Sequence, residues 1–118
     1  MKHRHSNRIL SRTANHRKAL LSNLSSELLE HGTIVTTKAK ASELRKFFEP
    51  LVTYAKGDAS LHRRRQLMSK VRRDGDVERL FTLAKKMEKR PGGYTRLTPL
   101  PPQRLDQAQM VRVELVED

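Results

Sequence analysis

The sequence predicts a small α+β fold, in which about four helices pack on a three-stranded mixed or antiparallel sheet and an extended basic arm precedes them. Four segments carry apolar residues at helical spacing, and three short segments are β-branched or alternate between apolar and polar residues. The first twelve residues show neither period. Because 118 residues suit one hydrophobic core, we expect an arm over 1–12 and a single globular domain over 13–118.

The first helix is expected at about 14–31. Its apolar stripe consists of Leu20, Leu21, Leu24 and Leu28. Thr13 and Asn15 are alternative N-caps, and Gly32 stands where a left-handed C-terminal cap is expected.

A short strand and a long helix are predicted next. The run "TIVTT" at 33–37 is entirely β-branched, which favours a pleated strand over a helix. The segment 38–57 then shows the strongest helical pattern, with an apolar stripe of Leu44, Phe47, Phe48, Leu51, Val52 and Ala55. Proline inside a helix costs about 3 kcal/mol, but the stripe keeps its phase across Pro50. We therefore predict one kinked helix.

Two further helices and two strands complete the chain. A helix over 60–73 has a thin apolar stripe of Leu61, Leu67, Met68 and Val71 among six basic residues. Asp76 is the expected N-cap of a helix over 77–89, whose buried face is predicted to be Val77, Leu80, Phe81, Ala84 and Met87. After the "PGG" turn at 91–93, the segments 94–100 and 110–117 alternate as strands do.

The composition points to a polyanionic partner. Lys and Arg number 25 against 13 Asp and Glu, so the formal net charge is +12. Five aromatic residues and no Trp offer little for a stacking platform that holds single strands. The absence of Cys excludes disulfides and thiolate metal sites, and no apolar run reaches the roughly 20 residues of a membrane span.

Catalytic and metal-binding patterns are missing from the sequence. General acid and base catalysis needs titratable groups that converge on one pocket, but the five histidines are scattered. Gly92 and Gly93 follow a predicted helix and precede a predicted strand, which reverses the order of a phosphate-binding loop. We therefore predict no enzymatic activity, metal, cofactor or small-molecule substrate.

Basic residues form three patches. The first comprises Lys2, Arg4, Arg8, Arg12, Arg17 and Lys18, the second Lys38 and Lys40, and the third Arg63, Arg64, Arg65, Lys70, Arg72 and Arg73. The first patch lacks a helical phase, which suits an arm along phosphates; a solvated basic tail is the alternative. The helix over 60–73 offers only Gln66 as an amide for base readout. Folded RNA is therefore the favoured ligand, and a DNA-binding architectural or regulatory protein is the alternative.

Several motifs carry a family resemblance. The stretches "MKHRHSNRILSRTANHRKALLSNL", "LLEHGTIVTTKAKASELR", "RPGGYTR" and "VELVED" closely resemble the bacterial-type large-subunit ribosomal protein seventeen family, over essentially the whole chain. The resemblance implies a small α/β domain with an N-terminal extension that binds large-subunit ribosomal RNA near the polypeptide exit, beside neighbouring ribosomal proteins and without enzymatic activity. It implies a cytoplasmic ribosome, with an organellar ribosome as the open alternative because the acid-free start also resembles a transit peptide.

The family motifs and the third basic patch together give the candidate RNA contacts. They are Lys2, His3, Arg4, Arg8, Arg12, His16, Arg17, Lys18, Lys38, Lys40, Arg63, Arg64, Gly92, Gly93, Tyr94 and Arg96. Arg96 is expected to pair with a phosphate. For Tyr94 two interpretations stand, a sheet aromatic that covers the core and a base-stacking residue.

Overall fold

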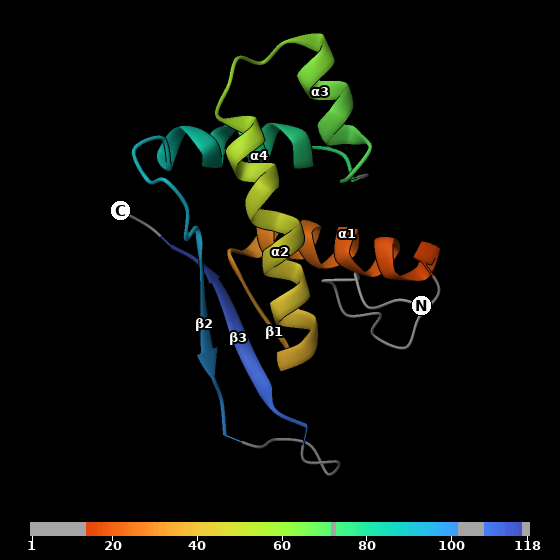
Figure 1. The fold of residues 1–118 in the computed structure, drawn as a ribbon, viewed down its shortest axis with the longest axis vertical. Coiled ribbons are helices and arrows are strands. Elements are labelled where there is room, and N and C mark those ends of the chain that lie inside the picture. The colour runs from red at the N-terminus through yellow and green to blue at the C-terminus, as the bar shows by residue number, and fades with distance from the viewer. Residues whose placement is uncertain (1–13, 72, 102–107, 117–118) are drawn as a thin grey trace, which may run out of the picture.

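The computed structural model describes residues 14–71, 73–101 and 108–116. The predicted arm lies outside these residues, so the division into arm and domain stays a prediction. Within them the α+β class is confirmed, with four helices and a three-stranded antiparallel sheet (Figure 1). The elements are α1 (Ala14–His31), β1 (Thr33–Thr37), α2 (Lys38–Ala55), α3 (Leu61–Met68), α4 (Asp76–Lys86), β2 (Thr95–Pro99) and β3 (Met110–Leu115).

The sheet has the strand order β1-β3-β2, and both pairings are antiparallel. The open choice between a mixed and an antiparallel sheet is thereby settled. Val113 stands opposite Ile34 on one side and Leu97 on the other, so an apolar row crosses all three strands. Side chains alternate across a pleated strand, and the neighbours Arg112 and Glu114 accordingly face away from the core.

The helices cover one face of the sheet. Helix α2 contacts all three strands, and α4 packs on α1 and α2. Figure 1 shows α3 at the far end from the strands, where it packs against α2 and α4. The core lies between these layers, and its largest fully buried side chains include Tyr94, Phe48, Leu28 and Leu44.

The bounds of α1 and β1 agree with the sequence prediction. Gly32 adopts φ +80°, and its N–H donates to the Leu28 carbonyl at 2.8 Å, as expected for a left-handed cap. Asn15 lies inside α1 and is not its N-cap. Helix α2 runs through Pro50 without interruption, so a single helix is confirmed.

The predicted helix over 60–73 is shorter than expected. It ends at Met68, and Ser69 occupies the C-cap position. Leu67 and Val71 are buried, but Leu61 and Met68 are 63% and 60% exposed, so half of the predicted apolar stripe is wrong. The stripe failed because Leu61 and Met68 point about 100–120° away from Leu67 around α3, and Val71 reaches the core from beyond the end of the helix.

The start of α4 corrects a second prediction. Gly75, at φ +85°, holds the N-cap position, and Asp76 is the first helical residue. The Asp76 side chain is fully buried and accepts a hydrogen bond from the Ser26 hydroxyl of α1. The carboxylate therefore joins two helices instead of capping one.

Candidate nucleic-acid interface

The predicted contacts Lys2, His3, Arg4, Arg8 and Arg12 lie outside the described residues. The first turn of α1 carries the next three. His16 and Lys18 are exposed there, and Arg17 is half-buried. Arg17 lines a cavity of about 250 Å³ together with Lys46 of α2 and Lys70. The fold thus brings together cations from three separate parts of the sequence.

Lys38 and Lys40 lie on the first turn of α2. This helix starts directly after β1 because Thr37 caps it, with the Thr37 hydroxyl accepting from the Lys40 N–H at 3.4 Å. The Lys38 N–H donates to the Gln109 carbonyl at 2.9 Å, which ties this helix start to the β3 end of the sheet. The Lys38 side chain is exposed and the Lys40 side chain is half-buried.

Arg63 and Arg64 make contacts within the chain. The Arg63 guanidinium donates to the Tyr54 carbonyl and lies 4.6 Å from the centre of the Tyr54 ring. Arg64 pairs with Glu78 of α4 and lies 5.1 Å from the centre of the Phe81 ring. Both cations therefore hold α3 to neighbouring helices, and their predicted contact with RNA stays a prediction.

The remaining candidates lie in the turn before β2 and on β2 itself. The Tyr94 side chain is 1% exposed, and its hydroxyl lies 3.0 Å from that of Thr53. This burial favours the first interpretation of Tyr94, an aromatic that covers the core. Arg96 is exposed on the outer face of the sheet, opposite Glu114.

The polar surroundings of Tyr94 act on its ionisation. Burial raises the pKa of the Tyr94 phenol, but hydrogen bonds with Lys56 and Thr53 and the charge of Lys56 lower it, and the net shift is downward. The Lys56 ammonium lies 4.8 Å from the centre of the ring and donates to the Arg90 carbonyl. These contacts fix the turn between α4 and β2 against the end of α2.

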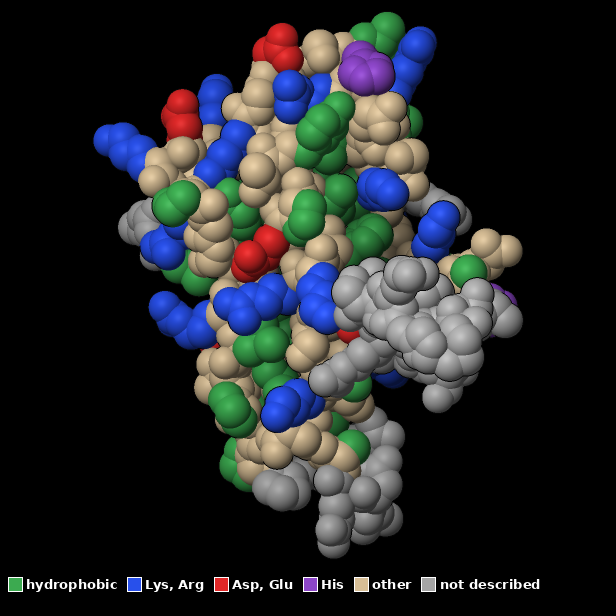
Figure 2. Space-filling model, viewed as in Figure 1, with side chains coloured by type: hydrophobic (Ala, Val, Ile, Leu, Met, Phe, Trp, Pro, Cys, Tyr) green, Lys and Arg blue, Asp and Glu red, His purple; other side chains and the backbone are tan. Residues whose placement is uncertain are grey.

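Two cations on α2 were missed at the sequence level. Arg45 and Lys46 have side chains that are 49% and 53% exposed. Lys46 lies on the face opposite the apolar stripe, and Arg45 lies beside the stripe. A basic pair at a helical phase complementary to the buried residues is the signal that could have revealed them. Figure 2 shows Lys and Arg side chains spread over the visible face of the molecule, with Asp and Glu side chains among them.

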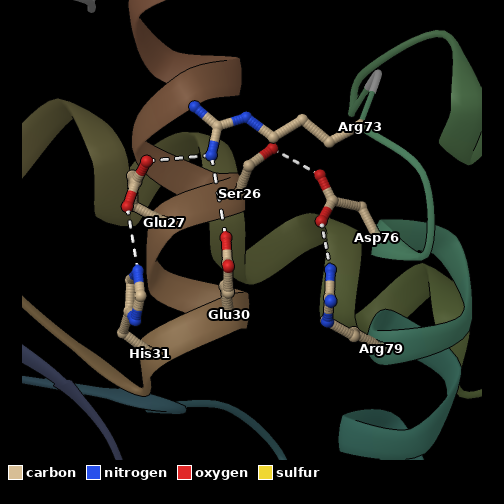
Figure 3. Close-up of polar contacts among 7 residues, drawn as sticks. All are labelled: Ser26, Glu27, Glu30, His31, Arg73, Asp76 and Arg79. Atoms are coloured by element: carbon tan, nitrogen blue, oxygen red, sulfur yellow. Dashed lines mark hydrogen bonds and ion pairs between the residues drawn. The ribbon is translucent and has the colours of Figure 1, made fainter.

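An ion-pair network joins α1 to the segment before α4 (Figure 3). Arg73 lies 2.8 Å from Glu27 and 3.9 Å from Glu30. The hydrogen bond from Arg73 lowers the pKa of Glu27, and it outweighs the opposing effect of desolvation. The carboxylates of Glu27 and Glu30 lie close to His31 in a spacing that suits a metal ion, but the Arg73 guanidinium already supplies the positive charge between them.

The chain resembles known proteins along its whole length. The family described as Ribosomal protein L17 matches residues 20–116. A protein of Maricaulis maris named large ribosomal subunit protein bL17 is 47% identical over 99% of this chain and 84% of its own length. Proteins of the same name from Desulfotalea psychrophila and Desulforapulum autotrophicum are 48% and 47% identical, over 98% and 100% of this chain and 90% and 98% of their own lengths. Among the described residues, every helix is too short or too polar to cross a bilayer.

Proposed function

Since this chain belongs to the ribosomal protein L17 family and is a non-enzymatic structural component of the large ribosomal subunit, we propose that it binds and braces large-subunit ribosomal RNA near the polypeptide exit. The match over nearly the whole chain to proteins named for the large subunit carries this proposal. Neighbouring large-subunit proteins are the further partners, and a cytoplasmic ribosome is the proposed compartment. Contributions to subunit assembly and translation follow from bracing the RNA.

The charge distribution supports RNA as the direct ligand. The 25 Lys and Arg residues exceed the 13 Asp and Glu residues, which leaves a formal net charge of +12. Exposed cations stand on the first turn of α1, at the start of α2, on the outer face of α2 and on β2. Phosphate contacts release counterions from RNA, so such surfaces bind strongly at low salt.

The structure also argues against a DNA-reading helix on α3. This helix has eight residues, and two of its arginines are engaged with Tyr54 and Glu78. A recognition helix needs side chains that project to base edges in the major groove. Helix α3 presents Arg65 as its exposed cation, which suits a phosphate better than a base pattern.

Sedimentation of a tagged copy tests the proposal. Cell extract is separated on a sucrose gradient at low and high salt, and ultraviolet crosslinks in the heavy fraction are sequenced. We expect the chain to stay with the large subunit at both salt concentrations and to crosslink to its RNA. A chain that sediments free of ribosomes, or that follows DNA, contradicts the proposal.

A triple variant isolates the arm in the same experiment. The change of Arg4, Arg8 and Arg12 to Ala removes three cations, and each lost phosphate contact lowers the salt slope of RNA binding by about 0.7–0.9. The matched control changes the exposed lysines Lys85, Lys86 and Lys89 to Ala and removes the same charge. Equal salt slopes for the two triple variants would show that net charge, and not the arm, governs binding.

A further inference from the structure

A groove of about 710 Å³ lies between α2 and the turn before β2. It is a shallow groove that is open to solvent over most of its extent. Pro50, Tyr54 and Pro91 supply apolar surface to it, and Gly92 lies at its border. Neither the family motifs nor the basic patches include Pro50 or Tyr54, whereas Pro91 belongs to the "RPGGYTR" motif.

The rim of the groove is cationic. Arg45 and Lys46 line it, and Glu49 is the one carboxylate among the lining residues. Glu49 already accepts hydrogen bonds from the Thr95 N–H at 3.2 Å and the Thr95 hydroxyl at 2.9 Å, and it lies 3.6 Å from Arg45 Nε. Arg45 is half exposed, and a guanidinium presents several donors in a planar fork. It can therefore contact Glu49 and a phosphate at the same time.

Gly92 has no structural reason to be glycine within the described part of the chain. Its φ lies outside the left-handed region, unlike that of Gly93 at +64°. A Cβ built on Gly92 meets nothing within 4 Å. Glycine nevertheless loses more conformational entropy on folding than any other residue. The open space around Gly92 leaves room for the close approach of a group from outside the chain.

We propose that this groove receives one unpaired nucleotide of the large-subunit RNA, a refinement that rests on the proposed function. The base lies against Pro50, Tyr54 and Pro91, and its phosphate pairs with Arg45 at the rim. Unpaired bases in RNA are recognised by stacking on apolar and aromatic surfaces. An apolar floor beside a cationic rim matches the two halves of a nucleotide, whereas a peptide segment would need no phosphate partner.

Crosslinking with large-subunit ribosomal RNA that contains 4-thiouridine tests the groove. The folded chain is bound to this RNA, irradiated and digested, and the crosslinked peptides are identified. We expect crosslinks in peptides that contain residues 45–54 and 91–94, to nucleotides that are unpaired in the RNA. Total RNA retention on a filter is measured in the same samples.

Three variants separate the groove from general binding. Pro50→Asp places a negative charge on the floor and Gly92→Leu fills the border, and each is expected to lower the groove crosslinks about tenfold. Lys89→Ala removes an exposed cation that does not line the groove, and it is expected to retain them. Melting curves of all three confirm the fold.

The outcomes distinguish the two proposals. If the wild-type chain retains RNA but its groove peptides do not crosslink, or if Pro50→Asp and Gly92→Leu crosslink like Lys89→Ala, the groove proposal is overturned and the proposed function stands. Crosslinks to paired nucleotides alone overturn it as well. If the wild-type chain does not retain the RNA at all, the proposed function itself fails.

Discussion

The buried contact between Ser26 and Asp76 links two helices that are 50 residues apart in sequence, and its removal tests how the fold is held together. Both side chains are almost fully buried, at 1% and 0% exposure. Asp76 also accepts from Arg79 at 3.2 Å, but Arg79 is 43% exposed. We expect Asp76→Ala to destabilise the fold strongly, because it leaves the buried Ser26 hydroxyl without its acceptor.

The magnitude follows from the two contacts. A hydrogen bond to a charged group contributes about 1.5–3 kcal/mol, and an exposed ion pair such as that with Arg79 contributes about 0.2–1 kcal/mol. Asp76→Ala should therefore lower the free energy of unfolding by about 3 kcal/mol. Ser26→Ala, which leaves the carboxylate with Arg79, should lower it by about 2 kcal/mol. The double variant leaves neither group unsatisfied, so its loss should be about 2 kcal/mol, which is smaller than the loss for Asp76→Ala alone and far from the sum.

Urea denaturation followed by far-ultraviolet circular dichroism measures these values. Ser25 is the matched control, since it is buried on the same helix but its hydroxyl has no hydrogen-bond partner among the described residues. Ser25→Ala should raise the free energy of unfolding by about 1 kcal/mol, because a buried hydroxyl without a partner is destabilising. Equal losses for the two serine variants, or an additive double variant, would refute the role assigned to Asp76.

Three further predictions concern single positions. Gly75→Ala should lower the melting temperature by about 4 °C, measured by calorimetry, because φ +85° is unfavourable by about 1 kcal/mol for alanine. Pro50→Ala should raise the free energy of unfolding by about 2 kcal/mol in urea, since it restores an N–H inside α2. Arg73→Gln should raise the pKa of Glu27 in a nuclear magnetic resonance titration, because Arg73 holds it below 4.5. That stabilisation is present above pH 4.5 and is lost below it, so the variant should show a weaker acid dependence of unfolding.

Local signals in the sequence predicted the elements well. The β-branched run at 33–37 correctly predicted β1. Gly32 correctly predicted the end of α1, because a left-handed cap depends on a single residue and its immediate neighbours. The continuous phase of the stripe across Pro50 correctly predicted one helix. These features depend on contacts within a few residues, which periodicity and turn chemistry report directly.

Contacts between distant residues explain what the sequence could not predict. Asp76 has the composition of an N-cap, but Ser26 of another helix uses its carboxylate. From the sequence, Arg64 is expected to be a solvated cation. In the folded chain it pairs with Glu78, which is 14 residues further along the sequence. No local pattern distinguishes a solvated arginine from one with a distant partner, so Arg63 and Arg64 of the third basic patch are predicted from the sequence as RNA contacts.

The placement of the carboxylates decides which cations are available to RNA. Glu27 and Glu30 of α1 pair with Arg73, which precedes α4, and Glu78 of α4 pairs with Arg64 of α3. In the most basic stretch of the sequence, Arg63, Arg64 and Arg73 are therefore paired with carboxylates at the surface. Arg45 and Lys46 on α2 also lie within ion-pair distance of carboxylates, those of Glu49 and Glu43, but their side chains are more exposed, at 49% and 53% against 36% for Arg64 and 42% for Arg73. RNA contact should accordingly depend more on α2 than on α3, although a count of basic residues ranks them in the opposite order.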